Sequence, residues 1–209
     1  MIDKMIGASE AAIYGVSYNL AAVITLFVNA INNSFVPTLY ESLKSKKCEN
    51  IKKVAAFLAI FMAGLICVFM LFGPEILTIF VAPEYIKAKW IFPPVAASIF
   101  FTFIYLFYVN VEFYFEKTNY VMFVSVLGAV VNIILNLVFI KKYGFIAAGY
   151  TTVFSYIVFC FAHYLLYKYI AKKEKTGNVY NDGIFMILGI AVLAFMLICI
   201  LLYKFNIVR

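Results

Sequence analysis

Two asparagines in one apolar run are the polar residues best placed for binding chemistry in this sequence. Asn132 and Asn136 lie four residues apart, and Ser125 and Gly128 continue the same spacing toward the start of the run. Residues three or four positions apart share a helical face. Such a stripe is typical of a packing seam between membrane helices, where small residues allow close approach and amides hydrogen-bond. It is also compatible with a cavity wall that presents amides to a polar ligand, and both interpretations remain open.

A second face combines aromatic and acidic side chains. The spacing of Tyr105, Tyr108, Glu112 and Glu116 places them on one side of a helix, with the two glutamates in its last turn. Tyrosines can stack on sugar rings and donate hydrogen bonds through their hydroxyls. They also serve as interfacial anchors, so a ligand-binding role and an anchoring role are equally supported.

A third polar group lies near the start of the chain. Asn29, Asn32 and Asn33 are spaced to share one helical face. Pro37 lacks a backbone N–H, so we expect the helix to kink or end near Asn33. We include Asn29 and Asn32 among the candidate cavity residues.

The sequence gives little support for a metal, a cofactor or catalysis. The only histidine, His163, has no Cys, Asp or Glu near it in the sequence. The four cysteines lack the spacing of a metal site or a disulfide framework. We therefore expect no cofactor, and we expect His163 to be a satisfied polar group, with a proton relay as the alternative.

The positions of the acidic residues argue against both an enzyme and a coupled pump. All ten fall in predicted loops or end turns, so we expect no carboxylate buried inside a span, where coupled pumps usually keep one. No nucleophile–base pair is evident, so we predict that the protein is not an enzyme.

Composition shows which elements must position these residues. Hydrophobic residues make up 66% of the 209-residue chain and charged residues only 13%, against roughly 45–50% and 25% in soluble domains. About 20 apolar residues cross a bilayer as a helix. The sequence therefore predicts an all-α polytopic membrane helix bundle, with residues 1–209 as a single transmembrane domain. The six predicted spans cover about 11–39, 54–72, 91–115, 120–140, 145–167 and 184–203.

Short polar segments connect these spans. Gly73 and Pro74 end the second span, and an amphipathic piece from Glu75 to Val81 is expected to lie at the membrane interface. Trp90 is placed as an interfacial anchor where the third span begins. A polar loop over 168–183 precedes the last span.

The net charge of +7 reflects membrane topology rather than nucleic-acid binding, because the basic residues lie in short loops between apolar runs. The side that holds the loops at 40–53, 116–119 and 168–183 carries ten lysines, and the other side carries seven basic residues. The positive-inside rule places the first side in the cytoplasm. Both termini are then expected to be non-cytoplasmic.

Three stretches resemble one protein family. They are DKMIGASEAAIYGVSYNLA (Asp3–Ala21), FYVNVEFYFEKTN (Phe107–Asn119) and NIILNLVFIKKYGFIAAGYTTVFSY (Asn132–Tyr156). They resemble the polysaccharide-biosynthesis flippases of the multidrug/oligosaccharidyl-lipid/polysaccharide exporter superfamily. Lys141 stands where the family usually has proline, and Ala147 and Gly149 exchange its usual glycine and alanine.

The resemblance implies a function that the residues alone do not. It implies the C-terminal part of a flippase that moves undecaprenyl-diphosphate-linked oligosaccharide outward across the bacterial cytoplasmic membrane, by alternating access of two lobes. This chain looks like the second lobe of such a MATE-like transporter without its first helix. The implied partners are membrane lipids, the lipid-linked oligosaccharide and a missing N-terminal lobe or second chain.

The same implication selects candidate residues. We expect six polar side chains to face the substrate cavity: Asn29, Asn32, Tyr105, Tyr108, Asn132 and Asn136. Five lysines at the predicted cytoplasmic mouth would attract the diphosphate or simply set the topology: Lys44, Lys46, Lys47, Lys52 and Lys53. A drug or cation exporter of the same superfamily, a membrane enzyme, and a non-transporting fragment that needs a partner chain are the alternatives.

Overall fold

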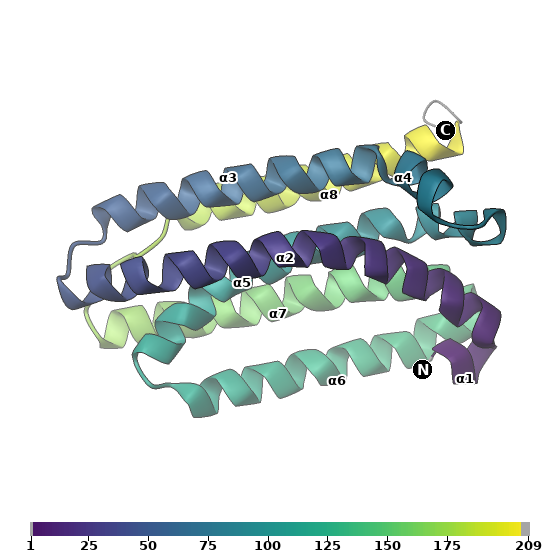
Figure 1. The fold of residues 1–209 in the computed structure, drawn as a ribbon. Coiled ribbons are helices and arrows are strands. Elements are labelled where there is room, and N and C mark those ends of the chain that lie inside the picture. Colours follow the sequence, from purple (N-terminus) through teal and green to yellow (C-terminus); the bar gives the residue numbers. More distant parts are fainter. Residues whose placement is uncertain (1, 206–209) are drawn as a thin grey trace.

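The computed structural model describes residues 2–205, and this part of the chain is helical without a strand (Figure 1). The elements are α1 (Ile2–Ile6), α2 (Ala8–Lys44), α3 (Glu49–Leu71), α4 (Gly73–Phe80), a 3₁₀ helix η1 (Pro83–Trp90), α5 (Phe92–Tyr114), α6 (Thr118–Tyr143), α7 (Ile146–Lys173) and α8 (Asp182–Lys204).

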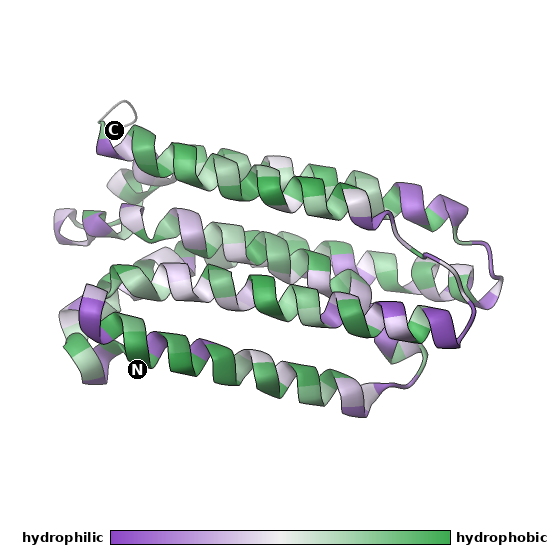
Figure 2. Cartoon of the chain, turned by 180° about the vertical axis from the view of Figure 1, so that it is seen from behind, coloured by the Kyte–Doolittle hydropathy of each residue, from purple (hydrophilic) through white to green (hydrophobic). Residues whose placement is uncertain are grey.

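Six of these helices are long and apolar enough to cross a membrane: α2, α3, α5, α6, α7 and α8. Their middle parts are mostly hydrophobic, whereas hydrophilic residues gather at the two ends of the bundle (Figure 2). Both ends of the described chain lie at the same end of the bundle (Figure 1). The predicted fold class, a polytopic membrane helix bundle, is confirmed.

Most helices extend beyond their predicted limits. α2 continues through Pro37 to Lys44, so of the two outcomes expected near Asn33, a kink or an end, the end is excluded. Proline removes only one backbone donor, and the remaining turns keep their hydrogen bonds. α7 continues to Lys173, which shortens the predicted polar loop to residues 174–181. The interfacial piece forms α4, while α1 and η1 were not predicted.

Helix α5 is the centre of the bundle. It packs against α2, α3, α7 and α8, and most of its residues are buried. Its closest partner is α7, where Gly149 lies so near the start of α5 that a Cβ there would come within 2.9 Å of Ile91 Cγ2. By contrast, α6 packs mainly along α7 and leaves most of its surface exposed at the edge of the bundle (Figure 1).

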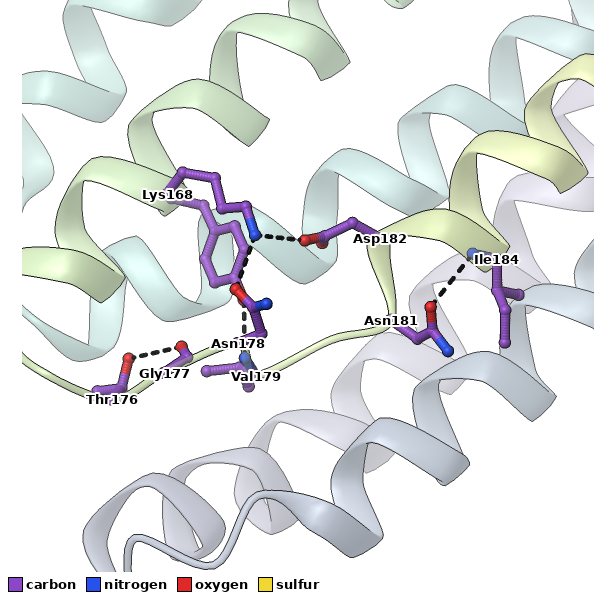
Figure 3. A network of polar contacts seen from close by, with 9 residues as sticks. Lys168, Thr176, Gly177, Asn178, Val179, Asn181, Asp182 and Ile184 are labelled. Atoms are coloured by element: carbon purple, nitrogen blue, oxygen red, sulfur yellow. Dashed lines mark hydrogen bonds and ion pairs between the residues drawn. The ribbon is translucent and has the colours of Figure 1, made fainter.

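The segment between α7 and α8 is fixed by polar contacts (Figure 3). Lys168 Nζ lies 2.7 Å from Asp182 Oδ2 and 2.7 Å from Asn178 Oδ1. Tyr180 donates its hydroxyl to the Phe107 carbonyl at 2.8 Å. Burial raises the pKa of Tyr180 well above its ordinary value, so its hydroxyl stays a neutral donor. These contacts attach the start of α8 to α5 and α7.

We therefore expect Tyr180→Phe to destabilise the bundle measurably. Loss of one buried hydrogen bond costs about 1 kcal/mol, which corresponds to roughly 2–4 °C for a chain of this size. The measurement is the apparent melting temperature of the purified protein in detergent. Tyr169→Phe is the matched control, because Tyr169 is 54% exposed. Equal melting temperatures for the two variants would contradict the anchoring role of Tyr180.

Candidate functional site

A cavity of about 410 Å³ lies between α2, α5, α6 and α7. Each of the four helices contributes side chains to its wall. The lining residues are Tyr14, Tyr18, Tyr105, Ser125, Gly128, Ala129, Asn132, Thr152, Ser155, Tyr156 and Phe159.

One wall is polar and is built by a hydrogen-bond ladder between α6 and α7. Asn132 Nδ2 donates to Ser155 Oγ at 3.1 Å, and Asn136 Nδ2 donates to Asn132 Oδ1 at 2.9 Å. The Thr151 hydroxyl donates to Asn136 Oδ1. The asparagine stripe is thus a packing seam, and its edge at Asn132 also lines the cavity. A primary amide has two N–H donors and two carbonyl lone pairs, so these two hydrogen bonds leave one donor and one acceptor position of Asn132 unused.

The other walls are aromatic. The rings of Tyr14 and Tyr18 on α2 stack with centroids 6.0 Å apart. The Tyr14 hydroxyl lies 3.3 Å from Thr152 Oγ1 and joins α2 to α7. Across the cavity, Tyr105 meets the edge of Phe159 at 4.6 Å. Aromatic faces of this kind stack on apolar ring faces, and tyrosines add a polar handle.

Gly128 sets how closely α6 approaches α7 at this site. A Cβ at Gly128 would lie 2.5 Å from Phe159 Cδ2. The absence of a side chain at this position lets the Phe159 ring pack directly against α6 and form part of the wall.

The lining residues offer an amide, hydroxyls and aromatic faces, and none of them carries a charge. A ligand group that is uncharged, rich in hydroxyls and partly apolar matches such a surface. The volume is within the roughly 300–1,000 Å³ of typical small-molecule sites.

The structure brings only part of the predicted set together here. Asn132 and Tyr105 line the cavity, and Asn136 lies directly behind Asn132 in the ladder. Asn32 accepts a hydrogen bond from Asn110 at 2.8 Å, between α2 and α5. Asn29 is exposed on α2.

Tyr108 lies elsewhere although it shares a helix with Tyr105. Its side chain is buried among Tyr164, Tyr167 and Phe185, on the side of α5 that meets α7 and α8. The expectation that both tyrosines face one cavity does not hold for Tyr108, because side chains of α7 and α8 enclose it.

The five candidate lysines lie at the end of the bundle opposite the chain termini (Figure 1). Lys52 pairs with Glu49 at 3.2 Å. Lys52 and Lys53 line a polar recess of about 580 Å³, together with Asp182, between the start of α3 and the segment before α8. Lys44, Lys46 and Lys47 are exposed. Attraction of a diphosphate and a plain topological role both stay predictions.

Glu112 and His163 form a buried pair that the sequence did not indicate. His163 Nδ1 lies 2.8 Å from Glu112 Oε2, and both side chains are fully buried. The expectation that no span buries a carboxylate is therefore wrong. The physical reason is the central position of α5, which is enclosed even in its last turn. Glu112 and His163 lie three and four residues before the C-terminal ends of their predicted spans, 91–115 and 145–167. This similar depth is the sequence signal from which their contact could have been predicted.

The sequence also missed Tyr14, Tyr18, Thr152 and Ser155. Spacings of three or four residues, as between Tyr14 and Tyr18, were present. They did not stand out, because polar residues at helical spacing are common where membrane helices pack.

Comparison with known proteins gives two relatives. No protein-family model matches the sequence. An uncharacterized membrane protein of Haemophilus influenzae is 30% identical over 126 residues, which are 59% of this chain and 31% of that protein. Lsg locus putative protein 1 of the same species is 24% identical over 127 residues, which are 60% of this chain and 32% of that protein. The matched part thus spans about a third of the length of each relative, and the first relative's name agrees with the six candidate spans.

Proposed function

We propose that this chain forms part of a flippase that moves a lipid-linked oligosaccharide across the bacterial cytoplasmic membrane. In this proposal the cavity between α2, α5, α6 and α7 takes the sugar headgroup, while the undecaprenyl chain stays in the bilayer. The observation that carries the proposal is the uncharged cavity wall of tyrosines, hydroxyls and one amide edge.

Sugar chemistry explains why this wall favours a glycan. A pyranose ring has an apolar face that stacks on aromatic rings and a rim of hydroxyls that exchange hydrogen bonds. The aromatic faces of Tyr18 and Tyr105 and the spare donor and acceptor of Asn132 supply both kinds of contact. The three family-like stretches support the same assignment.

The rest of the transporter is part of the proposal. The two relatives are about three times longer than the region they share with this chain. We propose that a second lobe, on the same or another chain, closes the cavity and that the two lobes rock to give alternating access.

A drug or cation exporter is the second candidate, because aromatic side chains also bind organic cations through their ring faces. The two candidates differ in what the cell loses. Without a flippase, surface polysaccharide falls and its lipid-linked precursor accumulates at the inner leaflet. Without a drug exporter, sensitivity to cationic drugs rises and polysaccharide stays normal.

Deletion of the gene in its own host tests the proposal. We expect surface polysaccharide to be lost, lipid-linked oligosaccharide to accumulate, and both effects to be reversed by the plasmid-borne gene. Normal polysaccharide with increased sensitivity to cationic drugs would replace the flippase proposal with the exporter.

We further propose that the lysine-rich end of the bundle is cytoplasmic, which places both termini outside. Cysteines can report this orientation once the four native cysteines are replaced by alanine. Lys47→Cys and Lys142→Cys are a matched pair, since both residues are exposed and lie at opposite ends of the bundle.

We expect a membrane-impermeant maleimide to label Lys142→Cys in intact spheroplasts and Lys47→Cys only after the membrane is opened. The opposite pattern would invert the proposed orientation.

A further inference from the structure

The buried pair of Glu112 and His163 is not used by the proposed binding function. His163 Nδ1 lies 2.8 and 3.1 Å from the two carboxylate oxygens of Glu112. The pair joins α5 to α7, the two helices that pack most extensively. Within residues 2–205, His163 Nε2 is buried and has no hydrogen-bond partner.

Electrostatics restricts how many protons this pair can hold. With one shared titratable proton, the pair is neutral overall, either as two neutral groups or as an internal ion pair. With two protons it carries a net positive charge, and with none a net negative charge. An unpaired charge in such a buried place is strongly destabilising. The arrangement in the structure therefore matches the one-proton state, and gain or loss of a proton favours water entry or a change in helix packing.

The ionisable groups around the pair come from several elements. At this end of the helices Lys117 pairs with Glu174 at 3.5 Å, and Asp182 at the start of α8 pairs with Lys168. Other titratable groups on the same elements are Tyr105 and Tyr108 on α5, Glu116 just after it, and Tyr156, Cys160, Tyr164 and Tyr167 on α7. Tyr14 and Tyr18 lie on α2 across the cavity. The cavity-lining part of α6 adds none.

Two aromatic rings connect the pair to the cavity. Tyr105 stacks on the His163 imidazole with centroids 5.5 Å apart and an interplanar angle of 25°. Phe159 meets the same imidazole edge-to-face at 4.5 Å. Both rings line the cavity, so the imidazole lies directly behind its wall.

We propose that Glu112 and His163 form a proton-binding site, and that a change in its proton occupancy moves Tyr105 and Phe159 and thereby reshapes the cavity. The proton site stands on the geometry of the pair alone. Its effect on transport rests on the proposed function of the cavity.

The proton site can be measured directly because His163 is the only histidine in the chain. Protein carrying ¹⁵N in the histidine ring, purified in lipid nanodiscs without a histidine tag, gives nitrogen signals from this side chain alone. We expect these signals to change with pH in a single transition, and the midpoint of this transition to move in Glu112→Gln. Signals that stay constant with pH would overturn the proton site.

The effect on the cavity has its own measurement, which needs no substrate. Ser125→Cys places a thiol in the cavity wall, in a background without the native cysteines. Gly64→Cys on α3 serves as a reference thiol, because the labelling of any cysteine rises with its thiolate fraction. We expect the labelling rate of Ser125→Cys with a neutral maleimide, divided by that of Gly64→Cys, to change severalfold around the pH at which the histidine signals change.

The variant Glu112→Gln/His163→Gln keeps a hydrogen-bonding pair that cannot titrate, and we expect it to remove this change. An identical pH dependence in that variant would overturn the coupling. If the double variant does not fold, the protein with the native Glu112–His163 pair decides the question. A corrected labelling rate of Ser125→Cys that stays constant across the pH range in which the histidine signals change would then overturn the coupling. Failure of the flippase proposal would leave both measurements unaffected.

Discussion

Asn132→Leu should reduce export of the lipid-linked oligosaccharide by about fivefold to a hundredfold while leaving the helix bundle folded. Leucine has nearly the shape of asparagine but offers no donor or acceptor. The substitution removes the free amide edge from the cavity and leaves glycan hydroxyls unpaired there, a loss of about 1–3 kcal/mol. Each 1.4 kcal/mol is a factor of ten in binding. The measurement is surface polysaccharide in cells that express the variant at the wild-type level.

Asn33→Leu is the matched control for this substitution. Asn33 is also an asparagine in a spanning helix, but it is exposed on α2 and does not line the cavity. We expect its export to match the wild type. Wild-type export in Asn132→Leu would exclude Asn132 from the site.

The second large effect is expected from a single added methyl group. In Gly128→Ala the new Cβ would lie 2.5 Å from Phe159 Cδ2 and 3.3 Å from Cγ of the same ring. The contact involves the base of the ring, so Phe159 must rotate into the cavity or α6 must move away from α7. Either response changes the wall that meets the headgroup, and we expect export to fall about as far as in Asn132→Leu.

A control and a rescue make this prediction specific. Gly64→Ala adds the same methyl group on α3, where a Cβ meets nothing within 4 Å, and should leave export unchanged. Adding Phe159→Leu to Gly128→Ala removes the clashing ring and should recover part of the lost export. The cavity assignment is contradicted if Gly128→Ala/Phe159→Leu folds but exports no more than Gly128→Ala. A loss of export in Gly64→Ala would also contradict it.

The sequence predicted the fold class and the six spans because apolar runs of membrane length have few alternatives in a bilayer. It could not predict that α5 is central and α6 peripheral. In a membrane protein, lipid-facing and protein-facing surfaces are both apolar, so hydrophobicity does not distinguish them. The same limit explains why the burial of Glu112 was not expected.

Local spacing predicted part of the cavity and missed contacts between distant helices. Asn132 and Tyr105 stood out as polar residues in apolar runs, and both line the cavity. The Tyr14–Thr152 contact joins residues 138 positions apart, and the Glu112–His163 contact joins residues 51 apart. Such contacts depend on which helices pair and how they rotate, and no periodicity in a single helix encodes that.

Photocrosslinking from the cavity wall tests the central claim most directly. Tyr18 lines the cavity, and Tyr143 is an exposed tyrosine on α6 outside it. Each is replaced in turn by p-benzoylphenylalanine in cells that make the polysaccharide, and the adducts formed under ultraviolet light are analysed by mass spectrometry. We predict an adduct containing sugar and isoprenoid diphosphate from position 18, and only phospholipid adducts from position 143. Phospholipid alone at both positions, in cells with abundant lipid-linked oligosaccharide, would contradict the account.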